Sequence, residues 1–103
     1  MTDELRKRIE ETIAKNRVML FMKGTPQMPQ CGFSAAVVGV LKQIGAPFGS
    51  YNILADPELR EGLKESSSWP TYPQLYVDGK LIGGADIVRD LHQKGELEGL
   101  VKG

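Results

Sequence analysis

The sequence predicts a single α/β domain built on a four-stranded mixed sheet with helices on both faces. An unbroken apolar run at residues 18–22 is typical of a strand buried on both faces. A hairpin pattern covers residues 74–82, and segments with helical spacing of apolar residues separate and flank these strands. With 103 residues, the chain is long enough for one core and too short for two, so we expect one domain over residues 1–103.

The first half of the chain predicts a helix, a strand, a loop and a second helix. Apolar residues recur at helical spacing among charges over residues 5–13, before the strand at 18–22. Residues 23–30 are too rich in proline and glycine for regular structure. A second helix follows, with apolar residues on one face over 37–44, and Gly45 ends it.

The middle of the chain predicts a second strand and a short helix. Residues 51–54 form the strand. Asp56-Pro57 opens the helix, because aspartate caps a helix start and proline fits its first turn. The serine- and proline-rich run at 66–73 predicts no regular structure, since each proline biases the residue before it toward an extended conformation.

The last third of the chain predicts the hairpin and two helices. Asp78-Gly79 lies between two apolar runs and is typical of a two-residue hairpin turn. Helical spacing follows over residues 87–91, and residues 97–101 form a last helical turn or two. The first two strands flank a helix, so we expect them to pair in parallel, with the hairpin adding antiparallel strands to the same sheet.

Composition argues against several partners. Thirteen basic residues balance thirteen acidic ones, so no net field recruits nucleic acid or an anionic membrane, and no apolar run approaches the roughly 20 residues of a membrane span. We expect neither nucleic acid nor a membrane as a partner. A single cysteine precludes an internal disulfide and favours a reducing compartment, either a bacterial cytoplasm or, if a presequence has been removed, an organelle matrix such as that of the mitochondrion.

The single cysteine, Cys31, is the most informative residue. It follows the strand and loop and begins the segment Cys31-Gly32-Phe33-Ser34 at the head of a helix. Peptide N–H groups at a helix start are unpaired and the helix dipole favours negative charge there, so we expect a thiol pKa below the ordinary value of about 8.5. A thiolate is a nucleophile and a metal ligand. The alternative is that Cys31 is a small buried hydrophobe.

The chain resembles a monothiol glutaredoxin with a Cys-Gly-Phe-Ser active site, a member of the thioredoxin-like superfamily. The resemblance covers nearly the whole chain and is carried, in order, by Lys23-Gly24-Thr25, Cys31-Gly32-Phe33-Ser34, Trp69-Pro70-Thr71, Pro73-Gln74, Gly83-Gly84 and Asp86. It implies the thioredoxin-like (glutaredoxin) fold. Ser34 stands where a dithiol oxidoreductase has its second cysteine, so any redox cycle must take its second sulfur from outside, and the resemblance implies glutathione.

The resemblance implies a cradle for glutathione around Cys31. Lys23, at the end of the first strand, is expected to place an ammonium near Cys31, lower its pKa and bind a carboxylate of the ligand. Arg60 corresponds to a second carboxylate clamp, and Lys64 is a weaker candidate for the same role. The alternative for the lysine and the arginine is an ordinary solvated charge.

Backbone groups complete the predicted cradle. Tyr72-Pro73 is expected to hold a cis peptide bond that turns the Tyr72 N–H and C=O toward an extended ligand. Gly84 permits close backbone approach, while Ala85 offers an N–H and Asp86 a carboxylate to the free amino end of the ligand. The alternatives are an ordinary turn and a first-turn acid that complements the helix dipole.

Three ring-bearing residues receive other expectations. Trp69 is expected to anchor its loop on the domain rather than to contact a ligand. Phe33 is expected to be an exposed apolar residue beside the thiolate, suited to contact with a second subunit. His92, the only histidine, is assigned to the surface or to packing and not to catalysis.

If the chain binds a [2Fe-2S] cluster, a count of ligands predicts that two chains share it. Clusters with purely sulfur ligation take four thiolates, and this chain has one. A [2Fe-2S] cluster therefore needs Cys31 from two chains and two glutathiones, which predicts a homodimer with the cluster and a monomer without it. The resemblance implies a carrier that transfers the cluster to apo iron-sulfur client proteins, with a BolA-like protein as a further partner and weak or no oxidoreductase activity.

Two other functions stay open on the sequence. One is a glutathione-dependent thiol-disulfide oxidoreductase of cell redox homeostasis, in which Cys31 attacks protein-glutathione mixed disulfides. The other is a thioredoxin-like interaction module with an idle cysteine. The long loop at 25–30 favours the carrier, as an inference from the family.

Overall fold

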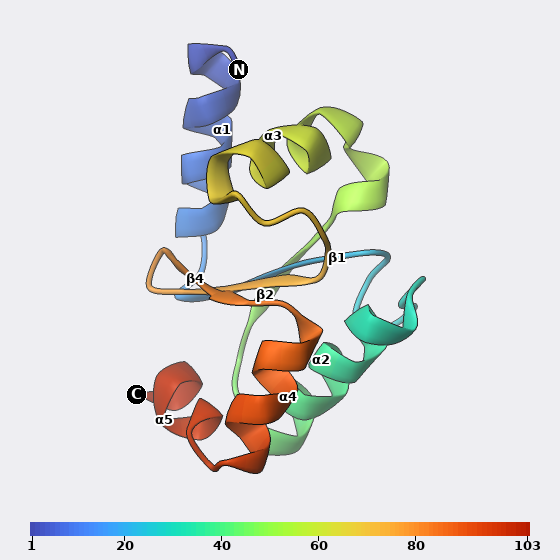
Figure 1. Ribbon diagram of the computed structural model, residues 1–103, viewed down its shortest axis with the longest axis vertical. Helices are drawn as coiled ribbons and strands as arrows, with labels where there is room; N and C mark the ends of the chain where they lie inside the picture. The colour runs from blue at the N-terminus through green and yellow to red at the C-terminus, as the bar shows by residue number, and fades with distance from the viewer.

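A four-stranded sheet divides the molecule into two layers of helices (Figure 1). The computed structural model describes residues 1–103. The strand order is β2-β1-β3-β4, and β1 pairs in parallel with β2 and antiparallel with β3, which pairs antiparallel with β4. The strands are β1 (Val18–Met22), β2 (Gly49–Asn52), β3 (Gln74–Val77) and β4 (Lys80–Gly83). The predicted mixed sheet is confirmed.

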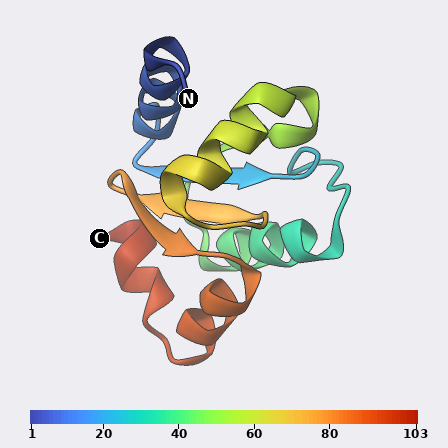
Figure 2. The ribbon, with the colours of Figure 1, turned by 45° about the horizontal axis from the view of Figure 1, so that its top comes forward.

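Helices cover both faces of this sheet, as predicted. On one face lie α1 (Asp3–Ala14) and α3 (Pro57–Ser67). On the other face lie α2 (Gly32–Ile44), α4 (Ala85–Gln93) and α5 (Leu97–Lys102), an arrangement that Figure 2 shows from a second direction. None of the helices combines the length and the apolar character needed to cross a bilayer.

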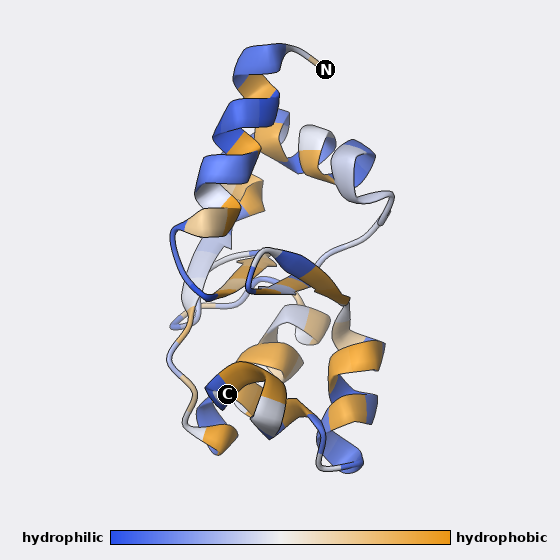
Figure 3. Ribbon diagram, turned by 90° about the vertical axis from the view of Figure 1, so that its left-hand side faces the viewer, coloured by the Kyte–Doolittle hydropathy of each residue, from blue (hydrophilic) through white to orange (hydrophobic).

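Strand β1 is the centre of the core because all five of its residues are buried. Successive side chains of a strand point to opposite faces, so β1 supplies both layers. Leu20 and Met22 pack in the cluster under α2, α4 and α5, whereas Met19 and Phe21 pack in the cluster under α1 and α3. In Figure 3, hydrophilic residues prevail on α1, and the sheet shows hydrophobic stretches beside hydrophilic ones.

Helix ends follow the local sequence. Gly45 adopts a left-handed conformation (φ 80°) and ends α2, as predicted. The side chain of Asp56 caps α3 by accepting the N–H of Leu59 at 3.2 Å, and Pro57 occupies the first turn. The predicted end of α2 and the predicted start of α3 are therefore confirmed.

Two predicted boundaries are wrong. The second strand covers Gly49–Asn52 rather than 51–54, because the side-chain oxygen of Asn52 accepts the N–H of Leu54 at 3.0 Å and turns the chain into a 3₁₀ segment, η1 (Ile53–Ala55). The run of serines does not exclude helix, since α3 continues to Ser67. Serine weakens a helix only slightly, and the buried inner face of α3 outweighs that cost.

Asp56 connects α1, β2 and α3. Beyond its capping bond, it accepts the hydroxyl hydrogen of Tyr51 at 2.6 Å and pairs with Arg8. Partial burial raises the pKa of the Asp56 carboxyl. The hydrogen bonds from Tyr51, Leu59 and Arg8, together with the Arg8 charge, lower it by more than burial raises it, so the pKa lies below the ordinary value.

We expect Asp56→Ala to lower the free energy of unfolding at pH 7 by about 2 kcal/mol, because it removes a helix cap and two further hydrogen bonds. Urea denaturation measures this loss. A carboxylate with a lowered folded pKa stabilises the protein above its unfolded pKa of about 3.9 and loses this contribution as pH falls through the folded pKa. The difference between wild type and variant should therefore narrow below about pH 4.

The control for this prediction is Asp90→Ala, which removes only an exposed pair with Lys94. Its expected cost is below about 0.5 kcal/mol. Equal losses in the two variants, or a difference that does not narrow in acid, would contradict the role of Asp56.

Candidate functional site

A cavity of about 500 Å³ lies where the end of β1, the starts of α2 and α4, and the α3–β3 loop come together. It is lined by Lys23, Cys31, Phe33, Trp69, Thr71, Tyr72, Pro73, Gly84, Ala85, Asp86 and Ile87. Of the eight site residues predicted from the sequence, seven line this cavity and Arg60 does not. Residues from four separate parts of the chain therefore form one site beside the only thiol.

Cys31 is the N-cap residue of α2 and is half-buried, so it is not the fully buried hydrophobe of the alternative interpretation. The pKa of its thiol is lowered. The largest cause is the backbone N–H of Ser34, which favours a negative charge on the sulfur. The N–H of Phe33 and the charge of Lys23 lower the pKa further, and partial desolvation opposes them. The helix start therefore favours the thiolate, and Lys23 supports it.

Ser34 has a structural role that its position in the motif does not reveal. Its side chain is fully buried, and its Oγ accepts the backbone N–H of Lys23 at 3.1 Å. This bond joins the end of β1 to the first turn of α2. The residue that replaces a second cysteine thus fixes the positions of Lys23 and Cys31 relative to each other.

The loop between β1 and α2 is an ordered turn. Thr25 and Met28 exchange backbone hydrogen bonds of 3.2 and 3.0 Å. Gly24 is required at its position, because its φ is +90° and an added Cβ would lie 2.5 Å from the carbonyl oxygen of Met28. The side-chain oxygen of Asn52 accepts the Gly24 N–H at 2.9 Å and thereby ties the loop to β2.

Gln74 holds the loop on the opposite side of the cavity. Its buried side-chain nitrogen donates to the carbonyl oxygens of Trp69 at 3.1 Å and Thr71 at 3.2 Å, and its oxygen accepts the hydroxyl hydrogen of Tyr76 at 3.0 Å. The Tyr72-Pro73 peptide bond is cis, as predicted. A glutamine directly after Pro73 is a recognisable signal, but its partners become evident only in the fold.

Trp69 combines the expected packing with a place in the cavity wall. Its Nε1 is buried without a hydrogen-bond partner, and an added Cβ on Gly84 would lie 3.3 Å from that nitrogen. A larger residue at 84 would therefore require the indole to shift by a few tenths of an ångström. The prediction that Trp69 only anchors its loop is incomplete, since the residue also lines the cavity.

The start of α4 presents free backbone donors and a carboxylate to the cavity. Gly84 is the N-cap, and the first intrahelical bond runs from Val88 N–H to Gly84 C=O, so the N–H groups of Ala85 and Asp86 have no helical acceptor. The exposed carboxylate of Asp86 pairs with Arg89 at 2.7 Å. These groups are the ones predicted for the amino end of a ligand.

Two of the predicted cations form no ion pair. Lys23 lines the cavity, and Arg60 lies on α3, where its carbonyl accepts the Tyr72 hydroxyl at 2.7 Å. Burial raises the pKa of Tyr72 well above its ordinary value, and the charge of Arg60 lowers it in part. The Arg60 guanidinium therefore lies close enough to interact electrostatically with a residue of the cavity wall. The Nε of Arg60 is buried without a partner, whereas Lys64 pairs with Glu61 at 3.1 Å.

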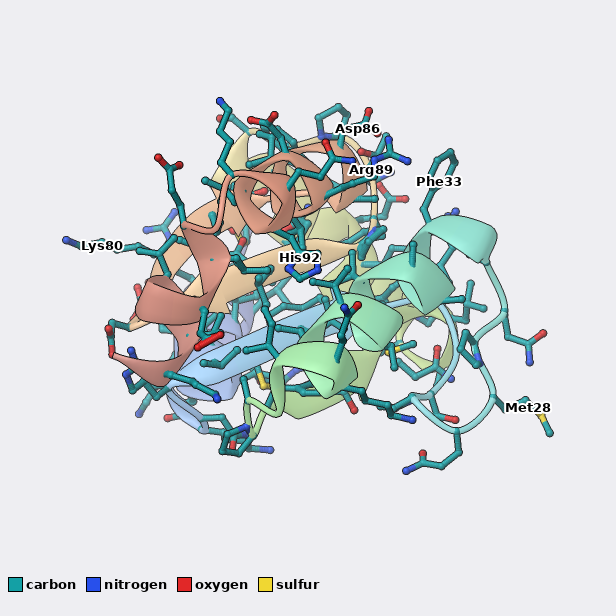
Figure 4. All side chains as sticks on the ribbon, turned by 90° about the horizontal axis from the view of Figure 1, so that it is seen from below. Met28, Phe33, Lys80, Asp86, Arg89 and His92 are labelled. Atoms are coloured by element: carbon teal, nitrogen blue, oxygen red, sulfur yellow. The ribbon has the colours of Figure 1, made fainter.

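Phe33 and His92 lie as predicted. Phe33 is 60% exposed at the edge of the cavity, and Figure 4 shows it on the same corner of the molecule as Asp86. Met28, at the tip of the loop, is 68% exposed and also points outward in this view. His92 is half-buried away from the cavity.

Comparison with known proteins decides the family. The Glutaredoxin family model matches residues 18–82, more than half of the chain. The chain belongs to the glutaredoxin family. Probable monothiol glutaredoxin 2 of Rickettsia typhi is 55% identical over 94 residues, covering 91% of this chain and 85% of that protein. The mitochondrial monothiol glutaredoxin-5 of Saccharomyces cerevisiae is 51% identical over 105 residues, covering 99% of this chain and 70% of that protein.

This glutaredoxin is thus one of the monothiol kind. Rice monothiol glutaredoxin-S11 is 55% identical over 100 residues, which cover 97% of this chain but 20% of the rice protein, so the chain spans about a fifth of that relative. The solution structure of reduced poplar apo GrxS14 has a TM-score of 0.82 at 51% identity, covering 95% of this chain and 90% of that one. A buckwheat glutaredoxin solved as a glutathione complex shares the fold, with a TM-score of 0.83 at 23% identity, covering 99% and 94% of the two chains. The thioredoxin-like α/β fold is confirmed.

We expect Lys23→Gln to raise the Cys31 thiol pKa only in part and to leave it below the ordinary value of a free thiol, because the Ser34 N–H is the larger cause of the lowered pKa. The pH dependence of alkylation by iodoacetamide, followed by mass spectrometry, measures this pKa. Lys42→Gln, in the last turn of α2, is the control and should change nothing. A thiol pKa at or above about 8.5 in Lys23→Gln would show that the lysine charge dominates.

Proposed function

We propose that the cavity binds glutathione with its sulfur beside Cys31. Glutathione is an extended tripeptide with two carboxylates, one ammonium and one thiol. Lys23 and Arg60 are cations without carboxylate partners, which suits them to hold its carboxylates. The backbone N–H and C=O of Tyr72 make no bond to other backbone groups and so suit an added strand. The N–H of Ala85, after Gly84, and the carboxylate of Asp86 would receive its amino end, and Pro73 completes the wall.

The proposed activity is that of a [2Fe-2S] cluster carrier, and one observation carries it: an accessible thiol with a lowered pKa is the only sulfur of its kind in the chain. A sulfur-ligated cluster takes four thiolates. Cys31 from each of two chains and two glutathiones would supply them, so the cluster-bound form would be a homodimer and the apo form a monomer. The exposed Phe33 beside the thiol suits contact with the second chain.

The carrier would receive the cluster and transfer it to apo iron-sulfur client proteins, with a BolA-like protein as a candidate partner. Transfer requires ligands that release, and two of the four proposed ligands are small molecules that exchange with solution. A reducing compartment suits this chemistry, whether a bacterial cytoplasm or a mitochondrial matrix, because it keeps both Cys31 and glutathione in the thiol form.

A second candidate is glutathione-dependent removal of glutathione from protein mixed disulfides, which the lowered thiol pKa also favours. The Cys31 thiolate would attack the glutathione sulfur, forming a Cys31–glutathione disulfide and releasing the protein thiolate. A second glutathione thiolate would then attack this disulfide, releasing oxidised glutathione and restoring Cys31. Ser34 cannot take part in either exchange, because its hydroxyl forms no disulfide.

We expect Arg60→Met to weaken glutathione binding about threefold to tenfold and Lys64→Met to leave it unchanged, because Arg60 has no ion pair whereas Lys64 already pairs with Glu61. Isothermal titration of the apo protein at low salt measures both constants. Each variant removes one half-buried cation from neighbouring turns of α3, so the two changes are matched in charge, burial and helix. Equal affinities in wild type and Arg60→Met would remove Arg60 from the proposed cradle.

Anaerobic reconstitution with iron, sulfide and glutathione should give a coloured dimer, and removal of the cluster with a chelator should return a colourless monomer. Absorption spectra and gel filtration follow the two changes together. Cys31→Ser should stay colourless and monomeric, whereas Ser50→Ala, exposed on β2 and outside the cavity, should behave as wild type. A wild-type protein that stays colourless throughout, or a coloured monomer, would refute the carrier.

A further inference from the structure

We propose that Arg89 is a specificity-determining residue: Arg89 and Asp86 together bind the zwitterionic end of glutathione, with Asp86 on the ammonium and Arg89 on the carboxylate of the same carbon. This inference rests on the proposed binding of glutathione in the cavity. It adds a residue that does not itself line the cavity and that no motif of the sequence indicates.

The geometry begins with the first turn of α4. Asp86 and Arg89 are three residues apart, so their side chains lie on one face of the helix, and the guanidinium nitrogen is 2.7 Å from the carboxylate oxygen. Asp86 lines the cavity, so its ion pair brings the Arg89 charge to the cavity rim. Figure 4 shows both side chains on the corner of the molecule where Phe33 projects beside the thiol.

The chemistry follows from the order of charges. The γ-glutamyl end of glutathione carries its ammonium and its carboxylate on one carbon, so an acid that binds the ammonium also brings the carboxylate close. Arg89 is the cation that the structure places against Asp86, and Asp86 is its only ion-pair partner. A carboxylate and a guanidinium side by side can form two ion pairs with a zwitterion, one to its ammonium and one to its carboxylate. Neither residue provides both ion pairs alone.

The free N–H groups at the start of α4 favour the same orientation. They attract a carboxylate, and the positive end of the helix dipole adds to the charge of Arg89. A competing interpretation is that Arg89 only neutralises Asp86 and must be displaced by the ligand ammonium. The two interpretations predict opposite changes in affinity when Arg89 is removed, so they are separable by experiment.

The test is isothermal titration at low salt with two ligands: glutathione, and γ-aminobutyryl-cysteinyl-glycine, which lacks only the carboxylate in question. We expect Arg89→Gln to weaken glutathione binding about threefold, with the effect shrinking as salt is raised, and to leave the affinity for the analogue unchanged. Arg89→Lys keeps the charge and should retain part of the preference for glutathione. Lys94→Gln, which removes an exposed pair with Asp90 on the same helix, is the matched control and should change neither affinity.

The titrations separate a failure of the Arg89 assignment from a failure of glutathione binding. If wild type binds glutathione and Arg89→Gln binds it equally or more tightly, or loses affinity for both ligands alike, Arg89 does not bind the carboxylate and only this inference is wrong. If wild type binds neither ligand, the proposed binding of glutathione fails, and this inference fails with it. A loss confined to glutathione supports the assignment.

Discussion

The start of helix α2 is the constraint on which the site depends. Cys31 occupies the N-cap position of this helix, and the backbone N–H groups of Ser34 and Phe33 lower the pKa of its thiol. The same helix start is joined to β1 by the bond from the Lys23 N–H to the buried Ser34 hydroxyl. Because β1 is buried on both faces, this bond attaches the helix start that carries the thiol to a strand in the core.

Three polar side chains, of which Ser34 and Gln74 are buried and Asn52 is half-buried, hold the segments around the cavity in place. Ser34 fixes the thiol, Asn52 fixes the following loop, and Gln74 fixes the loop that carries Trp69. Each of these side chains has hydrogen-bond partners, so none weakens the core as an unpaired polar group would. The buried side-chain nitrogens left without partners are the Nε1 of Trp69, in the cavity wall, and the Nε of Arg60, on α3. Both nitrogens are free to donate to the ligand proposed for the cavity.

The sequence predicts most of the fold because the fold depends on local signals. Periodicity and capping residues such as Gly45 place the helices, and a turn at Asp78-Gly79 places the hairpin. Strand β2 ends two residues earlier than predicted because the Asn52 side chain accepts the N–H of Leu54 and turns the chain. A pattern of apolar residues does not predict such a side-chain bond. The motifs predict which residues line the cavity, but they do not predict the hydrogen bonds of Asn52 and Gln74 that hold its loops. The Asn52–Gly24 bond spans 28 residues, so no local pattern predicts it.

The central claim is that each chain supplies one thiolate, so that the proposed [2Fe-2S] cluster must take its other sulfur ligands from a second chain and from glutathione. Native mass spectrometry of the anaerobically reconstituted protein tests it most directly. We predict a single cluster-bound species with the mass of two chains, two glutathiones and one [2Fe-2S] cluster. A cluster bound by one chain, or by two chains without glutathione, would contradict this account.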